Sequence, residues 1–83
     1  MNITEAVGKK VKHGSPALES EETIKQITFL MDGVEIEFES GAFASMSPGE
    51  FEHLMRYEEL LYSERSHGGM SHIVFCDKGT PIQ

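Results

Sequence analysis

Two neighbouring stretches in the first half of the chain alternate between hydrophobic and polar residues. They cover residues 23–31 and 34–40, and the second reads VEIEFES. An alternation with a period of two is typical of β-strands that bury one face. Asp32-Gly33 separates the stretches, and this dipeptide favours a two-residue type I′ turn between paired strands. The pattern therefore predicts a β-hairpin over residues 23–40.

A two-residue turn would fix which side chains face each other across this hairpin. Phe29 would lie opposite Ile36 on the side that faces the core. On the other side, Leu30 would be the only hydrophobic neighbour of the glutamates on the second strand. Such glutamates form either a solvated polar face or a surface that binds a basic partner. The register thus predicts an outward-facing acidic row, which consists of Glu35, Glu37 and Glu39.

The segment SPGEF carries several signals for the start of a helix. Ser47 can cap the helix, Pro48 suits its first position, and Glu50 completes a capping box. The hydrophobic positions that follow predict a main helix over residues 47–66, which ends before the Gly68-Gly69 pair.

Hydrophobic side chains would extend around more than half of this helix, although packing on one small sheet needs a stripe of only about 100°. Tyr57 and Leu60 would lie outside that stripe, close to His53. One interpretation is that the N-terminal segment covers them or that they are simply exposed. The other is that they form a second interface, either in a homodimer or with another protein.

The remaining segments complete the predicted fold. Residues 1–22 would form a short helix, capped by Asn2, and a basic loop, while 41–46 would be a connector. The apolar segment HIVFC predicts a third strand within residues 72–77, and 78–83 would be a tail. The whole chain is thus expected to form a single α+β domain of (α)ββαβ order. A three-stranded antiparallel sheet would carry the main helix on one face, with strand order 2-1-3 favoured and 1-2-3 as the alternative.

The charge is strongly acidic and unevenly distributed. The formal net charge is −7, and residues 19–83 contain four Lys and Arg residues against thirteen Asp and Glu residues. Such a body repels the phosphate backbone of nucleic acids, so direct nucleic-acid binding is not expected. It would instead attract basic surfaces of other proteins.

The cysteine content and the hydropathy pattern indicate a cellular compartment. Cys76 is the only cysteine, so no disulfide can form within the chain, which favours a reducing environment. No hydrophobic run approaches the roughly 20 residues of a membrane span, and the N-terminal residues lack the pattern of a signal peptide. We therefore expect a cytoplasmic protein without a membrane partner.

A basic cluster near the N-terminus is the first candidate for ligand chemistry. Lys9, Lys10, Lys12 and His13 could hold a small anion such as a nucleotide phosphate. The segment lacks the residue spacing of a phosphate-binding loop, however. A solvated basic loop is the favoured interpretation, and a small-ligand site is the alternative.

His67, His72 and Cys76 form the second candidate, because zinc prefers imidazole and thiolate ligands. On a strand, His72 and Cys76 would lie about 13 Å apart, which is too far for one ion. We therefore expect no metal and no cofactor. The sequence also lacks a recognisable pairing of catalytic acids, of nucleophile and base, or a dinucleotide-binding motif, so it predicts no enzyme.

In composition, the chain resembles the small acidic inhibitors that phages and mobile elements carry. Some of these proteins mimic nucleic acid and block restriction, CRISPR or transcription proteins. Together with the charge, the resemblance implies a non-enzymatic protein-binding module with an anti-defence role, which inhibits or regulates a host protein. The carboxylates that would stand in for phosphates are Glu35, Glu37, Glu39, Glu52 and Glu59.

Overall fold

The computed structural model describes residues 1–64 and 69–77, and this part of the chain contains two helices and six strands. Neither helix is long and hydrophobic enough to cross a membrane. The elements are α1 (Ile3–Ala6), β1 (Lys10–Ser15), β2 (Leu18–Phe29), β3 (Val34–Phe38), β4 (Phe43–Met46), α2 (Pro48–Tyr57), β5 (Glu59–Ser63) and β6 (Met70–Phe75).

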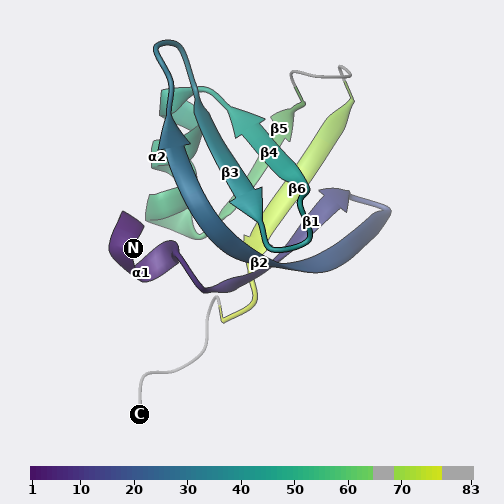
Figure 1. The fold of residues 1–83 in the computed structure, drawn as a ribbon. Coiled ribbons are helices and arrows are strands. Elements are labelled where there is room, and N and C mark those ends of the chain that lie inside the picture. Colours follow the sequence, from purple (N-terminus) through teal and green to yellow (C-terminus); the bar gives the residue numbers. More distant parts are fainter. Residues whose placement is uncertain (65–68, 78–83) are drawn as a thin grey trace.

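The strands form one antiparallel sheet in the order β4-β3-β2-β1-β6-β5 (Figure 1). β2 is the longest strand and connects the two halves of the sheet. Its residues 18–23 pair with β1, and its residues from Ile24 onward pair with β3. A register irregularity between Ile24 and Gln26 lies at this junction. Because such irregularities bend and twist a strand, both halves of the sheet can curve around one core.

Both halves of the sheet and one face of α2 bury their hydrophobic residues together. β3 illustrates the pattern, since Val34, Ile36 and Phe38 are buried while the glutamates between them are only partly buried. The buried cluster consists of Ala6, Val11, Ile24, Val34, Ile36, Phe38, Ala44, Met46, Phe51, Leu54, Met55, Leu60, Tyr62, Ile73 and Phe75.

Both helices start as the sequence predicts. The N–H of Glu5 donates to the Asn2 side chain (2.9 Å), and the Glu5 carboxylate accepts from the N–H of Asn2 (3.2 Å). Ser47 and Glu50 form the same reciprocal pair at α2, where Pro48 takes the first helical position. The two predicted helix caps are therefore confirmed.

The prediction of a three-stranded sheet with one main helix is wrong. Most of the segment expected to be a basic loop forms the hairpin of β1 and β2. Between residues 10 and 23, Val11 is the only buried residue, so the hydrophobic alternation that indicates a strand is nearly absent. Gly14 precedes the turn with a φ of 151°, and a Cβ there would collide with the carbonyl oxygen of Leu18.

The main helix is also much shorter than the predicted one, because it ends at Tyr57. Glu58 follows with a φ of 63°, a left-handed conformation that terminates the helix. β5 begins at the next residue, with Leu60 and Tyr62 buried and Leu61 exposed between them. The wide hydrophobic distribution around the predicted helix was therefore a sign of a strand, in which consecutive side chains point to opposite faces.

The strand neighbours differ from both predicted orders. The last strand, β6, pairs with β1 and β5 and has no place beside the predicted hairpin. The predicted connector at 41–46 contains β4, which pairs with β3 and extends the sheet on that side. Both orders, 2-1-3 and 1-2-3, are therefore wrong, and the predicted tail at 78–83 lies outside the described residues.

The predicted hairpin is present as β2 and β3, but its register differs by two residues. Phe29 lies opposite Val34 rather than Ile36. The turn runs from Leu30 to Gly33 and is closed by a hydrogen bond from the N–H of Leu30 to the carbonyl oxygen of Gly33 (2.8 Å). Gly33 is not among the described residues with positive φ, so the turn is not type I′. A shift of two residues keeps the side chains of β3 on their predicted faces. Phe29, which was expected to face the core, is instead 57% exposed at the end of β2, where its ring contacts that of Phe51.

Candidate functional site

Helix α2 and the strand that follows it expose aromatic and hydrophobic side chains next to one another. The rings of His53 and Tyr57 on α2 lie with their centroids 4.6 Å apart. Tyr57 is 53% exposed, and Leu61 on β5 is 56% exposed. Together with Glu59 and His72, they line an open hollow of about 500 Å³. These five residues are called the α2–β5 surface below.

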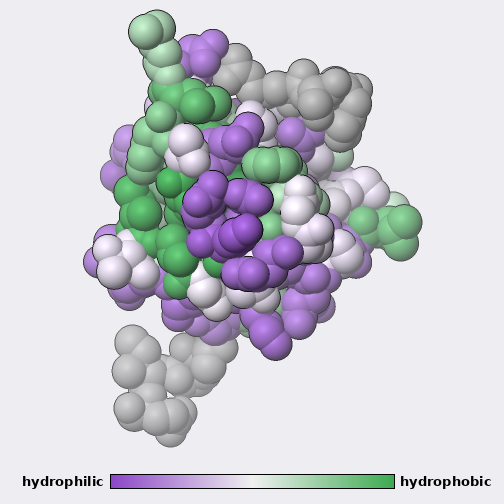
Figure 2. All heavy atoms as spheres, in the orientation of Figure 1, coloured by the Kyte–Doolittle hydropathy of each residue, from purple (hydrophilic) through white to green (hydrophobic). Residues whose placement is uncertain are grey.

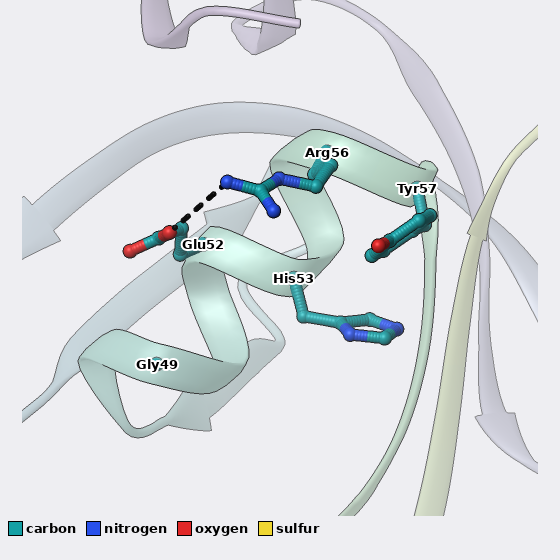
Figure 3. A pocket seen from close by; sticks show the side chains of 5 residues that line it. All are labelled: Gly49, Glu52, His53, Arg56 and Tyr57. Atoms are coloured by element: carbon teal, nitrogen blue, oxygen red, sulfur yellow. Dashed lines mark hydrogen bonds and ion pairs between the residues drawn. The ribbon is translucent and has the colours of Figure 1, made fainter.

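A smaller hollow of about 330 Å³ adjoins this surface on the same helix, between Gly49 and Arg56. His53 and Tyr57 line both hollows. Figure 3 shows their two rings beside each other, and Arg56 and Glu52, which line the same hollow, are joined by an ion pair of 3.5 Å. The exposed aromatic area therefore has one acidic and one basic neighbour on α2 itself.

Two glutamates that meet at His72 make the far side of the α2–β5 surface acidic. β6 places it opposite Leu61 on β5. Its Nδ1 contacts Glu19, and its Nε2 lies 3.7 Å from the carboxylate of Glu59. Two glutamates from different strands thus meet at one histidine beside the exposed hydrophobic residues.

The acidic row lies on the outer face of β3, inside the sheet rather than at its edge. Glu35 and Glu37 are partly buried, Glu39 is exposed, and Figure 2 shows hydrophilic side chains over the middle of this face. The carboxylate of Glu37 accepts a hydrogen bond from Gln26 (2.8 Å) and lies 4.0 Å from the ammonium group of Lys25. Side chains of β2 therefore satisfy part of the charge of the row.

The five glutamates that were predicted to mimic phosphates do not form one surface. Glu35 and Glu37 point outward from β3, whose other face packs into the core together with α2. Glu52 lies on the exposed side of α2, and Glu59 belongs to the α2–β5 surface. The core thus separates Glu35 and Glu37 from Glu52 and Glu59, and phosphate mimicry by these carboxylates stays a prediction.

Leu60 was predicted to form part of an exposed interface with Tyr57, but it is only 6% exposed and packs in the core. Leu61 takes its place on the surface. A helical arrangement had put Leu61 on the core side, so the sequence interpretation missed it. The available signal was the hydrophobic run at 60–62, since a short run of this kind is as typical of a strand as of a helix.

The basic cluster is divided by the strand that contains most of it. Lys10 and Lys12 are exposed on the outer face of β1, whereas His13 points to the inner face. Lys9 precedes the strand and pairs with Asp77 at 2.8 Å; this hydrogen bond raises the pKa of Lys9. The four side chains therefore do not converge on one small anion, and no observation favours a nucleotide site there.

His13 instead belongs to a chain of polar side chains at the inner face of the sheet. The hydroxyl of Tyr62 donates to the carboxylate of Glu64 (3.1 Å), and its oxygen accepts from Nε2 of His13 at 3.0 Å. Burial lowers the pKa of His13, and burial followed by the charge of Glu64 raises the pKa of Tyr62. The sequence interpretation missed this chain because it placed Tyr62 and Glu64 on the main helix.

Within residues 1–64 and 69–77, no three His, Cys, Asp or Glu side chains are arranged to hold a metal ion. Cys76 is exposed just after β6, while His72 contacts Glu19. His67, the third member of the predicted cluster, lies outside the described residues.

Comparisons with protein-family models, with curated proteins and with solved structures find no match to this chain. Its function has to be inferred from its own residues and geometry.

Proposed function

We propose that the protein is a non-enzymatic protein-binding module, which engages a basic partner through the α2–β5 surface and thereby inhibits or regulates it. One observation carries this proposal. Tyr57 and Leu61 come from different elements, yet both expose more than half of their surface at the same hollow.

Hydrophobic exposure of this kind is costly for a protein that works alone. Exposed single hydrophobic residues are common, but a tyrosine, a histidine ring and a leucine around one hollow resemble the centre of a protein–protein interface. Tyrosine in particular is enriched among the residues that contribute most to binding. The rings of His53 and Tyr57, tilted at 46° to each other, present a joint aromatic surface at this hollow.

The charge around the hollow indicates the nature of the partner. Glu52 and Glu59 flank the exposed aromatic rings, and Glu19 contacts His72. Arg56, which pairs with Glu52, contributes a positive charge beside them. With a net charge of −7 over the whole chain, the protein attracts positively charged surfaces at long range. A partner with lysine or arginine around a hydrophobic centre is therefore the best complement. A cytoplasmic location, which the single cysteine favours, is part of this proposal.

A selection of random peptides displayed on phage, with the purified protein as bait, tests the proposal. We expect the enriched peptides to combine Lys or Arg with hydrophobic residues. Tyr57→Ser should weaken their binding about tenfold or more, as expected for a central interface residue. The matched control is the triple variant Glu35→Gln, Glu37→Gln and Glu39→Gln, which should bind almost as well as the wild type.

The opposite pattern would contradict the proposal. If the triple variant loses binding and Tyr57→Ser does not, the acidic row on β3 is the binding surface. If the selection enriches peptides without basic residues, charge does not define the partner.

A further inference from the structure

β5 is the last strand of the sheet that the described residues form, and within residues 1–64 and 69–77 only one of its sides is paired. Its neighbour is β6, and the strand order ends with it. A terminal strand presents backbone N–H and C=O groups that can pair with another chain. The question is which groups of β5 lie on that open side.

The hydrogen bonds at the two ends of the β5–β6 pair answer this question. The N–H of Phe75 donates to the carbonyl oxygen of Glu58 (3.0 Å), and the N–H of Glu64 donates to the carbonyl oxygen of Gly69 (2.7 Å). In an antiparallel pair, hydrogen-bonded and non-hydrogen-bonded residues alternate. The even-numbered residues of β5 therefore bond to β6, and the backbone groups of Leu61 and Ser63 point away from it.

This open side coincides with the α2–β5 surface. Leu60 from the inner face of β5 and Leu61 from its outer face both line the larger hollow, so the hollow lies along the edge of the strand. Natural edge strands are commonly protected by lysine, proline, a bulge or a covering helix or loop. Helix α2 adjoins β5 at the hollow but leaves Leu61 56% exposed. The sequence of β5, ELLYS, contains neither lysine nor proline, and its register with β6 is regular.

On the basis of the proposed function, we infer that β5 binds an extended basic segment of its partner by strand addition. The backbone groups of Leu61 and Ser63 pair with the segment. Alternate side chains of an added strand point to opposite faces. Glu59 lies on the outer face of β5, so the added strand needs lysine or arginine on that face. Leu60 lines the hollow from the inner face, so the added strand needs hydrophobic residues there.

Charge favours this occupant over a second copy of the same chain. Antiparallel pairing of two β5 strands would bring together the acidic surroundings of both, which include Glu52, Glu58 and Glu59. Each chain also carries a net charge of −7. Like charges near each other oppose association, whereas a basic strand neutralises them.

The test uses the synthetic peptide KVKVKVKVK, labelled with a fluorophore, and the full-length protein. Leu61→Pro removes an outward N–H without touching the bonds to β6, and proline is tolerated at such edge positions. We expect this change to weaken peptide binding about tenfold, as the loss of one or two backbone hydrogen bonds implies. Leu61→Thr keeps the N–H but loses the hydrophobic contact, so it should weaken binding clearly less than Leu61→Pro does.

Two matched controls address the edge and the backbone separately. Ser45 lies at the equivalent position on β4, the other terminal strand. The N–H of Phe38 donates to the carbonyl oxygen of Ala42, so the even-numbered residues of β4 bond to β3. By the same alternation, the backbone groups of Ser45 point away from β3. Ser45→Pro should leave peptide binding unchanged. A peptide with methylated backbone nitrogens at every second residue keeps its charge but should not bind.

Amide hydrogen exchange measured by NMR provides a direct readout. Addition of the peptide should slow the exchange of the Leu61 and Ser63 amides about tenfold or more. If Leu61→Pro fails to fold, as circular dichroism would show, the methylated peptide and the exchange data still decide the question.

Several results would overturn strand addition. In the binding experiments, these are unchanged affinity of Leu61→Pro for the peptide, equal affinity of the wild type for the methylated peptide, or no binding of the peptide at all. In the exchange experiment, it is slowed amide exchange on β4 instead of β5. Self-association of the protein through β5 would also overturn it. If the phage selection still yields basic peptides that depend on Tyr57, the proposed function stands and only the binding mode is wrong.

Discussion

The acidic row on β3 and the α2–β5 surface both carry glutamates at the surface, yet their surroundings differ. β3 has a partner strand on each side, β2 and β4, so its backbone groups are occupied. Glu37 has neighbours on β2 that accommodate its charge, in Gln26 and Lys25. In the part of the chain that the structure describes, β5 has a partner strand on one side only, and Leu61 and Tyr57 beside it are more than half exposed.

The difference shows that the amount of charge does not identify a binding surface by itself. A row of glutamates on an interior strand is explained by the need for a polar outer face on an antiparallel sheet. The α2–β5 surface combines acidic groups with exposed hydrophobic residues and an open strand edge. Neither of these last two features is needed for folding, so they are the stronger indication of a partner.

The largest expected effect separates the two faces of β5. Leu60→Ala should lower the free energy of unfolding by about 2–5 kcal/mol, because it opens a cavity in the core. Leu61→Ala should change it by no more than about 0.5 kcal/mol, since Leu61 is exposed. Urea unfolding followed by circular dichroism measures both values. Similar losses for the two variants would mean that β5 is not oriented as described.

A tyrosine pair gives the second comparison. Tyr62→Phe should cost about 1–3 kcal/mol of unfolding free energy, because Glu64 and His13 lose a buried hydrogen-bond partner. Tyr57→Phe should cost no more than about 0.5 kcal/mol, because the ring of Tyr57 is exposed and keeps its contact with His53. Thermal and urea unfolding provide the measurement. Equal stability of Tyr62→Phe and the wild type would show that the hydrogen bonds of the Tyr62 hydroxyl do not stabilise the fold.

The third effect depends on pH. Burial lowers the pKa of His13, and the carboxylates of Glu64, Glu22 and Glu19 oppose this only in part. The unfolded chain therefore binds a proton at His13 more readily than the folded chain. The resulting stabilisation is complete above the unfolded pKa of about 6.5 and is lost as the pH falls through the lower folded value. Unfolding at pH 7.5 and 5.5 should show a smaller loss on acidification for His13→Gln than for wild type. An identical loss would exclude His13 as the cause.

The smallest expected effect concerns the acidic row itself. Replacement of Glu35, Glu37 and Glu39 by glutamine should change the unfolding free energy by about 0–1 kcal/mol, as is usual for surface charges. The double variant Glu52→Gln and Glu59→Gln should have a similarly small effect on stability, but it should slow association with a basic peptide and flatten the dependence of binding on salt. Stopped-flow association rates at two salt concentrations distinguish the variants. If the salt dependence of peptide binding becomes flatter in the triple variant alone, the acidic row on β3 is the binding surface.

The sequence by itself determined the features that depend on neighbouring residues. Asn2 with Glu5 and Ser47 with Glu50 place both helix starts, because each cap is made by groups three residues apart. The alternation on β3 assigns each of its side chains to the correct face, and this survives the two-residue error in register because the strand period is two.

Tertiary structure decided where the chain leaves a helix, which strands pair, and therefore which edge stays open. Residues 59–63 fit a helical pattern as well as a strand, and pairing with β6, the next strand along the chain, selects the strand. β1 has one fully buried residue, Val11, and owes its conformation to partners on both sides. The pairing of β1 with β6 joins segments far apart in the chain, and local propensity does not encode such a contact. The sequence thus identified Tyr57, His53 and Glu59 as candidates, while the pairing of β5 alone put Leu61 and an open backbone edge beside them.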